Sequence, residues 1–585
     1  MLSPQLQLML NYPLSQLPES FFQLTGITDP DIWDVLVIYN DSLEVPTPDD
    51  LVIYQVTILG KGFALLTLPK NQIQQLDKIP TIEYIMLPEV MQYTLDKKVS
   101  EVCGSNIASP SSGYGVTGKG IYFASIDSGI DYTHPDFINP DGTTRIAYLW
   151  DQTIEGTPPE GFFQGAEFSA ADINLALKNP ALVPSVDELG HGTALCGIAV
   201  GNGRADFRER YKGVAPEAEL IVVKVGQQGD NEIKSSTRGP RNTEIMMALK
   251  YVVDKAILHN KPISILIGFG INEGGHNGNS SLEKYIDSLS TSWRVNVVVS
   301  AGNQANKDSH VSGKLTPREV KKISVFIDDG QPYYFATLWK SFIDDFGIVI
   351  QSPSGERTDL MVREQVNTNT LLKDTLVSLN FSQASPVSDG EQIIIFLDNI
   401  IGEPIEDGNW TIELTGIEIL DGSYDIWGES LEQDVRSIRF NEPTKDKTIT
   451  IPATSDYATS VAACMNNGLL IAPFSGRGYT RSGKIKPDIS APGVNVISAS
   501  INKEVMYQAF TGSSAAAAFV AGGYLLLLEY GINQVGNQYL FGEDLKAYII
   551  RTAKRQRSIS YPNQEWGYGE LCIKSALLEL SRLYN

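Results

Sequence analysis

The chain has 585 residues, a formal net charge of −23 and a pI near 4.7. Its length predicts two to four domains, because a single hydrophobic core stops growing beyond about 250–300 residues. Its hydrophobic content of 42% and charged content of 20% are those of an ordinary globular protein. The strong acidity argues against nucleic acid as a partner, since phosphate binding needs a basic surface.

The N-terminus and the hydropathy pattern argue against a targeting or membrane segment. Residues 1–8 contain no basic region and lead into no long apolar run, so a conventional secretory signal is not expected. No apolar run approaches the ~20 residues that a membrane span needs. We therefore expect cytoplasmic synthesis, or delivery by a route that the sequence does not display.

The four cysteines, Cys103, Cys196, Cys464 and Cys572, lie far apart in the sequence. Their spacing fits neither a CxxC metal site nor a dense disulfide framework. We expect buried free thiols, with Cys196 packed beneath the nearby His191.

Residues 1–95 are expected to form a small α+β unit. Short apolar runs predict strands at 35–39, 52–56, 63–68 and 82–86, and a helical pattern covers 71–76. A Gly60-Lys61-Gly62 turn separates the second strand from the third. This order of elements predicts a ferredoxin-like module.

Residues 96–311 change to alternating strands and helices. Continuous apolar runs at 121–126, 220–225, 263–267 and 295–299 are typical of buried strands, and helical patterns at 242–258 and 281–288 lie between them. Such a pattern predicts an α/β fold with a parallel sheet covered by helices on both faces.

Residues 312–450 carry a different pattern, in which short strands recur between turn residues. The strands expected at 322–326, 347–350, 392–397 and 409–414 predict an all-β sandwich or jelly roll. The α/β character returns over residues 451–585. The β unit is therefore expected to be an insertion within the α/β domain.

Three residues in this order carry candidate chemistry: Asp127, His191 and Ser514. Asp127 follows an uncharged strand, where α/β folds place ligands, although a turn-forming residue before Gly129 is the simpler interpretation. His191 lies between Gly190 and Gly192 and could act as a general base, or could simply mark a loop or a helix start.

Ser514 precedes four alanines and could be a nucleophile at a helix N-terminus, or only the N-cap of a buried helix. The simpler interpretations are adequate for each residue alone. They explain poorly why aspartate, histidine and serine occur in the order of the subtilisin triad.

The chain resembles the subtilisin-like family of serine proteases, the subtilases. The similarity rests on motifs in residues 117–305 and 451–580: Ile126-Asp127-Ser128-Gly129-Ile130, His134-Pro135-Asp136-Phe137, Gly190-His191-Gly192-Thr193, Ser300-Ala301-Gly302-Asn303, Lys486-Pro487-Asp488 with Ala491-Pro492-Gly493, and Trp566-Gly567-Tyr568-Gly569.

This resemblance implies a serine endopeptidase with an Asp127–His191–Ser514 triad and with Asn303 as a donor to the oxyanion. It also implies two edges that bind the polypeptide substrate: Gly268-Phe269-Gly270, and Ser300-Ala301-Gly302 as a wall of the P1 pocket. Phe269 is expected to narrow the P4 side of the cleft.

The serine motif departs from the family pattern Gly-Thr-Ser-Met-Ala-x-Pro. Ser513 replaces the threonine, Ala515 the methionine and Ala518 the proline. The following Val520-Ala521-Gly522 sets the register and selects Ser514, rather than Ser513, as the nucleophile.

By resemblance, residues 1–95 are a propeptide that assists folding and inhibits the enzyme by laying its C-terminal end through the cleft. Residues 89–93 would then occupy the cleft, with self-cleavage after Tyr93 or a neighbour.

The β insertion, together with the missing signal peptide and the alanine-rich serine motif, resembles the Csp germination proteases of clostridia. In that group the propeptide stays bound after cleavage, and the target is the precursor of a spore-cortex lytic enzyme. The resemblance thus implies spore association.

No metal or organic cofactor is expected for the chemistry. Structural calcium is common in the family, but the sequence contains no recognisable ligand loop. Two alternatives to an active enzyme remain. One is an inactive subtilase scaffold that senses a ligand or a partner, and the other is a carbohydrate-binding module with Trp410 or Trp427 as its aromatic platform.

Overall fold

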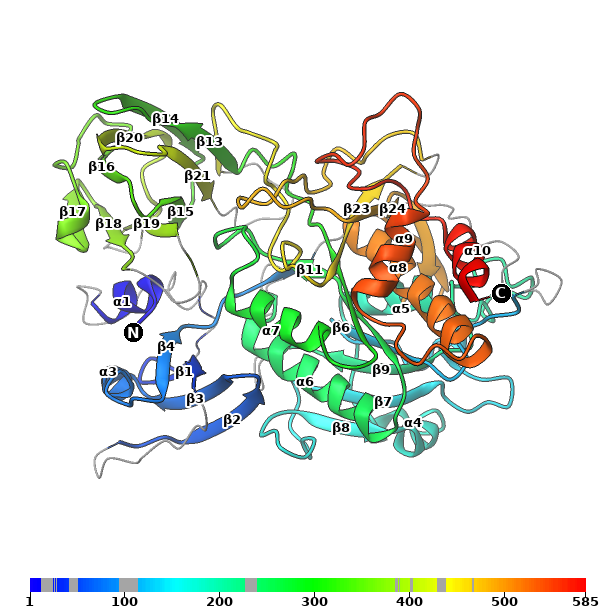
Figure 1. Cartoon of the computed structure of the whole chain (residues 1–585). Helices are drawn as coiled ribbons and strands as arrows, with labels where there is room; N and C mark the ends of the chain where they lie inside the picture. Colours follow the sequence, from blue (N-terminus) through cyan, green and yellow to red (C-terminus); the bar gives the residue numbers. More distant parts are fainter. Residues whose placement is uncertain are drawn as a thin grey trace.

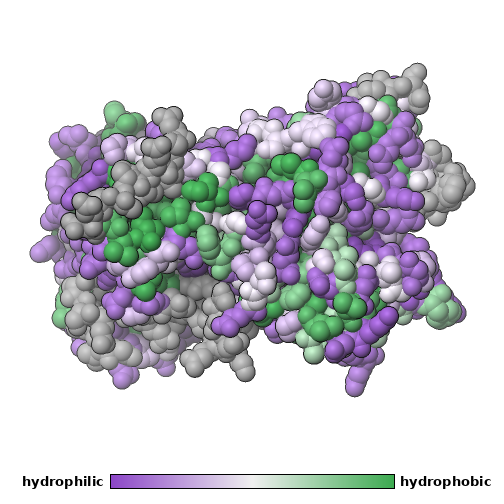
Figure 2. Space-filling model, turned by 90° about the horizontal axis from the view of Figure 1, so that it is seen from below, coloured by the Kyte–Doolittle hydropathy of each residue, from purple (hydrophilic) through white to green (hydrophobic). Residues whose placement is uncertain are grey.

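The computed structural model describes residues 1–11, 25, 27, 29–40, 51–93, 114–226, 239–383, 388, 390–399, 403–428, 438–465 and 468–584. It contains an α/β unit, a small N-terminal sheet and a β unit, and the N-terminal helix α1 (Pro4–Leu10) lies between the last two (Figure 1). Hydrophilic side chains cover much of the face shown in Figure 2, where hydrophobic residues form separate patches.

The α/β unit is built on an eight-stranded sheet in the order β24-β23-β12-β10-β6-β9-β7-β8. Its strands are β6 (Tyr122–Asp127), β7 (Ile146–Asp151), β8 (Ala166–Ser169), β9 (Glu219–Lys224), β10 (Ile263–Ile267), β12 (Val295–Ser300), β23 (Thr459–Cys464) and β24 (Ile489–Pro492). All neighbours are parallel except the edge strand β8, which runs antiparallel to β7. The parallel sheet expected from the apolar runs is therefore present.

Helices cover both faces of this sheet. One face packs against α5 (His191–Val200), α8 (Ser513–Leu528) and α10 (Ile573–Tyr584), and the other against α6 (Asn242–Leu258) and α7 (Ser281–Ser290). Successive residues of β6 alternate between the two cores, with Phe123 in one and Tyr122 and Ala124 in the other. Peripheral elements are α4 (Ala170–Ala176), α9 (Glu543–Arg551) and the hairpin of β25 (Val496–Ala499) and β26 (Tyr507–Phe510).

The helical segment Ser513–Gln534, which comprises α8 and the turn after it, is the one stretch of the described chain long and apolar enough to cross a membrane. Its most apolar window is 89% buried inside the protein, so α8 serves here as a core helix. Cys196, Cys464 and Cys572 are buried free thiols, and burial raises the pKa of Cys196. Cys103 lies outside the described residues.

The N-terminal unit is a four-stranded antiparallel sheet in the order β2-β3-β1-β4, with the short helix α3 (Ile73–Leu76). Its strands are β1 (Ile32–Tyr39), β2 (Gln55–Gly60), β3 (Phe63–Pro69) and β4 (Ile82–Met86). The second strand begins three residues later than expected and continues into the Gly60-Lys61-Gly62 turn, because its pairing with β3 runs up to that turn. Residues 41–50, between β1 and β2, lie outside the described chain, so the ferredoxin-like topology stays a prediction.

The two faces of this small sheet pack against different partners. Leu36, Phe63 and Leu65 face helices α6 and α7, where the rings of Phe63 and Tyr285 meet edge to face at 5.6 Å. The intervening residues of the same strands pack on α1 and on the β unit. Because both faces of β3 are buried, its sequence is a nearly continuous apolar run.

The inserted β unit consists of two antiparallel sheets around one core. The larger sheet contains β13 (His310–Lys314), β21 (Ser423–Gly428), β15 (Tyr333–Ser341), β19 (Gly390–Asn399), β18 (Thr375–Phe381) and β17 (Asn367–Leu372) in that order. The smaller contains β16 (Asp345–Gln351), β20 (Gly408–Glu418), β14 (Val320–Ile327) and β22 (Ile438–Phe440). Outward residues of the larger sheet, such as Phe335 and Phe396, join the apolar core under α1.

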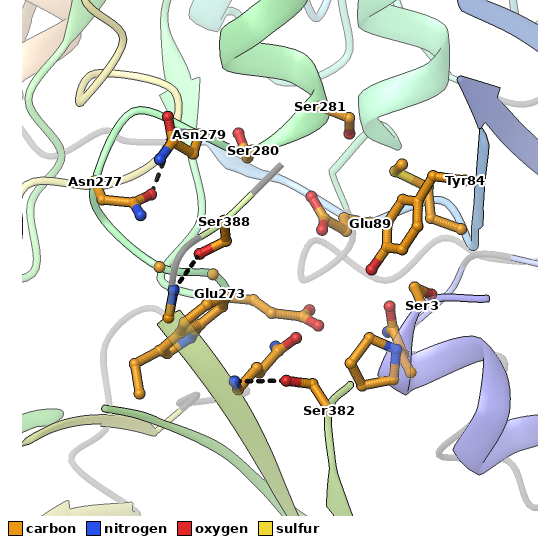
Figure 3. A pocket seen from close by; sticks show the side chains of 18 of the residues that line it. Ser3, Tyr84, Glu89, Glu273, Asn277, Asn279, Ser280, Ser281, Ser382 and Ser388 are labelled. Carbon is orange, nitrogen blue, oxygen red and sulfur yellow. Dashed lines mark hydrogen bonds between the residues drawn. The ribbon is translucent and has the colours of Figure 1, made fainter. Parts of the chain in front are cut away.

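A cavity of about 90 Å³ lies where the three units meet. Figure 3 shows Tyr84 and Glu89 of the N-terminal unit, Glu273 of the α/β unit and Ser382 and Ser388 of the β unit around it. The N-terminal unit therefore contacts both other units at one junction.

Candidate active site

Asp127, His191 and Ser514 form a continuous hydrogen-bonded chain. His191 Nδ1 lies 2.6 Å from Asp127 Oδ1, and His191 Nε2 lies 3.1 Å from Ser514 Oγ. All three side chains are almost fully buried. In the tautomer that carries its proton on Nδ1, His191 donates to the carboxylate and accepts from the hydroxyl, which suits a general base.

The fold places each of these residues at the end of a regular element. Asp127 ends strand β6 at the carboxyl edge of the parallel sheet, His191 begins α5, and Ser514 lies in the first turn of α8. The helix α5 approaches the loop after β6 so closely that a Cβ on Gly192 would lie 2.1 Å from Gly129 O. The glycine after the histidine is therefore required for His191 to reach Asp127.

Asp187 holds the start of α5 against the strand that carries Asp127. Its Oδ1 accepts from Ser128 Oγ at 2.7 Å and from Gly190 N at 2.8 Å, and its Oδ2 accepts from Thr193 N at 2.9 Å. Sequence analysis missed this positioning residue. The available signal was an aspartate three residues before a helix-opening glycine, a place where a carboxylate satisfies free backbone donors.

Asn303 lies just after β12, and its Oδ1 accepts a hydrogen bond from Ser513 N at 3.0 Å. Because a backbone N–H can donate only to the amide oxygen, this contact fixes the orientation of the amide and turns Nδ2 away from Ser513. Ser513 Oγ in turn accepts from Gly302 N at 3.0 Å. The serine that replaces the family's threonine thus keeps a hydroxyl that ties the loop of Asn303 to the helix of Ser514.

A strand of the N-terminal unit lies in the cleft between two edges of the α/β unit. Strand β5 (Gln92–Tyr93) pairs antiparallel with β11 (Phe269–Gly270), with Tyr93 opposite Phe269 and Gln92 opposite Gly270. On the other side, Met91 N donates to Pro240 O at 2.7 Å. Backbone pairing on both sides is the mode by which extended peptides add to a sheet edge.

The side chains of Met91 and Phe269 are fully buried in the same apolar cluster. Among the other residues expected at the substrate edges, Gly268 follows β10, and Ser300 ends β12. Ala301 continues that edge, with its carbonyl accepting from Thr450 N at 3.1 Å. A Cβ on Gly268 would lie 2.9 Å from His191 Cε1, so this edge runs directly beside His191.

The tryptophans considered as a carbohydrate platform are buried, with exposures of 1% for Trp410 and 2% for Trp427. The ring of Trp427 stacks on that of His276, with centroids 4.1 Å apart, and on that of His310, with centroids 4.8 Å apart. That alternative function therefore lacks the exposed aromatic surface it needs, because both rings serve packing. His310 is the first residue of strand β13.

No cluster of three or more His, Cys, Asp or Glu side chains suited to a metal occurs within the described chain.

Residues 118–327 and 435–569 match the subtilase family of S8 peptidases, and residues 2–89 match the Csp protease B prodomain. The chain belongs to the subtilase family and carries a CspB-type prodomain. It is similar to the solved structure of the Clostridium perfringens CspB protease, with 31% identity and a TM-score of 0.74, over 82% of this chain and 96% of that one.

Two curated relatives are more distant. The minor extracellular protease Vpr of Bacillus subtilis is 24% identical over 88% of this chain and 60% of its own length. The PI-type proteinase of Lactococcus lactis subsp. cremoris is 26% identical over 41% of this chain and 12% of its own length. The chain therefore spans 60% or less of these relatives.

Proposed function

We propose that the chain is an endopeptidase in which Ser514 is the nucleophile, His191 the general base and Asp127 the group that orients His191. Ser514 Oγ attacks the substrate carbonyl carbon while its proton passes to His191 Nε2. That proton then goes to the leaving amine, and water hydrolyses the acyl-enzyme. The hydrogen-bonded chain from Asp127 to Ser514 is the observation that carries this proposal.

The oxyanion formed in this step needs donors. Asn303 Nδ2, oriented through the contact of Oδ1 with Ser513, and the backbone N–H of Ser514 in the first turn of α8 are suited to that role. Loss of one such donor costs about 10²–10³ in kcat. No cofactor takes part in this mechanism, and we expect activity to persist after treatment with EDTA.

Labelling with a fluorophosphonate probe tests the nucleophile. We expect the protein to be labelled, Ser514→Ala to lose labelling completely, and the neighbouring Ser513→Ala to keep a reduced rate. Absence of labelling in the unsubstituted protein after removal of the propeptide would favour the inactive scaffold.

The N-terminal unit is the substrate of a first, internal cleavage in this proposal. In the antiparallel register of β5 and β11, a substrate residue that follows the one paired with Phe269 would face Gly268, beside His191. Cleavage is then expected after Thr94, one residue beyond Tyr93 and outside the described residues. Intact-mass analysis and N-terminal sequencing locate the bond, and Ser514→Ala serves as the uncleaved control.

In this proposal the propeptide has a ferredoxin-like fold and the β unit a jelly-roll fold. The propeptide stays bound after cleavage, because it packs on both the α/β unit and the β unit. Co-purification of the cleaved propeptide with the remainder of the chain is the expected result.

The physiological target proposed here is the precursor of a spore-cortex lytic enzyme, which rests on the resemblance to Csp germination proteases and places the protein in spores. Incubation of that precursor with the protein should yield one defined product, and Ser514→Ala should yield none. Spore fractionation with an antibody tests the location.

A further inference from the structure

We propose that Thr450 restricts the specificity of this peptidase to peptide bonds that follow a short, hydrogen-bonding side chain. The inference deepens the proposed proteolytic function, on which it rests, and names the substrate class that the site accepts. Thr450 belongs to no motif singled out in the sequence, and its role follows from its position between the two substrate edges.

The backbone at Thr450 joins these two edges. Thr450 N donates to Ala301 O at 3.1 Å, and Ile451 N donates to Ile271 O at 2.9 Å. The segment therefore crosses from the loop of Asn303 to the continuation of β11 and closes the space between them.

The side chain of Thr450 fills the end of that space. A Cβ built on Gly270 would lie 2.4 Å from Thr450 Oγ1, and one built on Gly302 would lie 2.4 Å from the same atom. Each substrate edge therefore has a glycine, Gly270 or Gly302, where it faces Thr450. A side chain that enters between the two edges would contact the side chain of Thr450.

The hydroxyl of Thr450 is fully buried and has no hydrogen-bond partner among the described residues. Buried polar groups are nearly always paired, so we infer that the partner of this hydroxyl, which lies between the two substrate edges, arrives with the substrate. A hydroxyl both donates and accepts, so the side chain of serine, threonine or asparagine can supply that partner.

The residue that would reach this space is the one whose carbonyl is attacked. A peptide paired like β5 places residues 92 and 93 opposite Gly270 and Phe269, and the next residue opposite Gly268, beside His191 and Asp127. With its carbonyl at Ser514 and Asn303, we infer that its side chain enters the space between Gly270 and Gly302 and meets Thr450. In this chain that next residue is Thr94, which has the chemistry that the pocket favours.

Self-cleavage of the full chain measures this preference directly. Position 94 is changed to Ser, Val or Phe, and each change is combined with Thr450→Val or Thr450→Gly. Time courses of processing are followed by mass during cell-free synthesis. The ratio of rates within one Thr450 background is compared, so that differences in folding yield cancel.

We expect Thr94→Val, which removes only the hydroxyl, to slow processing by about tenfold or more, because a site built around a polar group rejects the apolar analogue. Thr94→Phe should slow it by about 100-fold, since the ring collides with Thr450. Thr94→Ser should process at nearly the normal rate. Thr450→Val should remove the penalty of Thr94→Val, and Thr450→Gly should relieve that of Thr94→Phe.

The matched control is Thr448→Val, because Thr448 Oγ1 already pairs with Arg477 N at 3.1 Å, and it should leave every ratio unchanged. Equal processing of the unsubstituted chain and the Thr94→Phe variant, or penalties that persist in both Thr450 variants, would overturn the proposal. Failure of the catalytic assignment looks different, because the unsubstituted chain would then neither be processed nor react with a fluorophosphonate.

Discussion

The propeptide is held on two sides by contacts of different kinds. In the cleft, residues 90–93 pair through backbone atoms with β11 and with the Pro240–Arg241 segment. On the far side, α1 and the outer face of its sheet share an apolar core with the β unit, which contributes Phe335, Ile394 and Phe396. The first kind of contact accepts many sequences, whereas the second requires particular side chains.

This difference indicates that the two contacts have different functions: the cleft contact permits turnover, and the far-side contact retains the propeptide. A peptidase must release the product that occupies its cleft, so backbone pairing there is suited to turnover. The apolar core on the far side contains no group of the triad, and burial of each large apolar side chain contributes about 1.5–3 kcal/mol. If the proposed self-cleavage cuts its connection to the rest of the chain, the propeptide can be retained through this far-side core.

The largest effect is expected on the rate of propeptide cleavage, in a variant that keeps both propeptide contacts. Asp127→Asn leaves both contacts in place but favours the wrong tautomer of His191, so processing should slow by about 10⁴-fold. Mass analysis of newly made protein measures this rate. Normal processing of the variant would show that Asp127 does not orient the base.

The far-side contact is broken by Phe396→Ala, which empties a fully buried position in the shared core. A loss of about 3–5 kcal/mol is expected for such a truncation. The cleaved propeptide should then separate from the protein on size exclusion, although processing still occurs. Phe326→Ala, a half-buried residue of β14 outside this core, is the matched control and should retain the propeptide.

Acid should weaken the junction between the β unit and the α/β unit through His276, which stacks on Trp427. Burial lowers the pKa of His276 to about 4. The carbonyl oxygens of Ile449 and Asn272, which face the ring nitrogens, favour the protonated ring and raise the pKa, but their effect is smaller than that of burial. The unfolded chain, with an ordinary pKa of 6.5, therefore takes up the proton first.

The free energy of unfolding should consequently fall as pH drops from 6.5 to about 4, by at most about 3 kcal/mol, and His276 should add no further loss below that range. Urea unfolding at pH 7.5 and pH 5 measures the difference. His276→Asn, which suits the positive φ of 45° at this position, should show a smaller difference. An unchanged difference would assign the acid sensitivity to other groups.

The smallest effect is expected on propeptide affinity, when a contact on the cleft side is weakened. Asp34 of the propeptide pairs with the buried Arg241 at 2.8 Å, and Arg241 also pairs with Glu244 of its own helix. Asp34→Asn should weaken propeptide binding by about 1–2 kcal/mol, or roughly tenfold, because Arg241 keeps one carboxylate. Competition with added propeptide measures the change, and the exposed Asp77 offers Asp77→Asn as a control without effect.

Much of the α/β unit followed from the sequence. The runs at 121–126, 220–225, 263–267 and 295–299 became neighbouring strands, because continuous apolar runs between helices require a sheet buried on both faces. Asp127, His191 and Ser514 were selected by the residues beside them, and those neighbours are local features, such as the close approach that Gly192 permits.

What the tertiary structure alone decided are contacts between residues far apart in the chain. Asp187 accepts a hydrogen bond from Ser128, which is 59 residues away in the sequence. Thr450 lies between Gly270 and Gly302 and closes the space that these two glycines border. The β unit, placed between residues of the α/β unit in the sequence, packs on the N-terminal sheet instead of standing apart. A pattern of apolar and polar residues indicates which faces must be buried, whereas the partner of each face depends on how the whole chain closes.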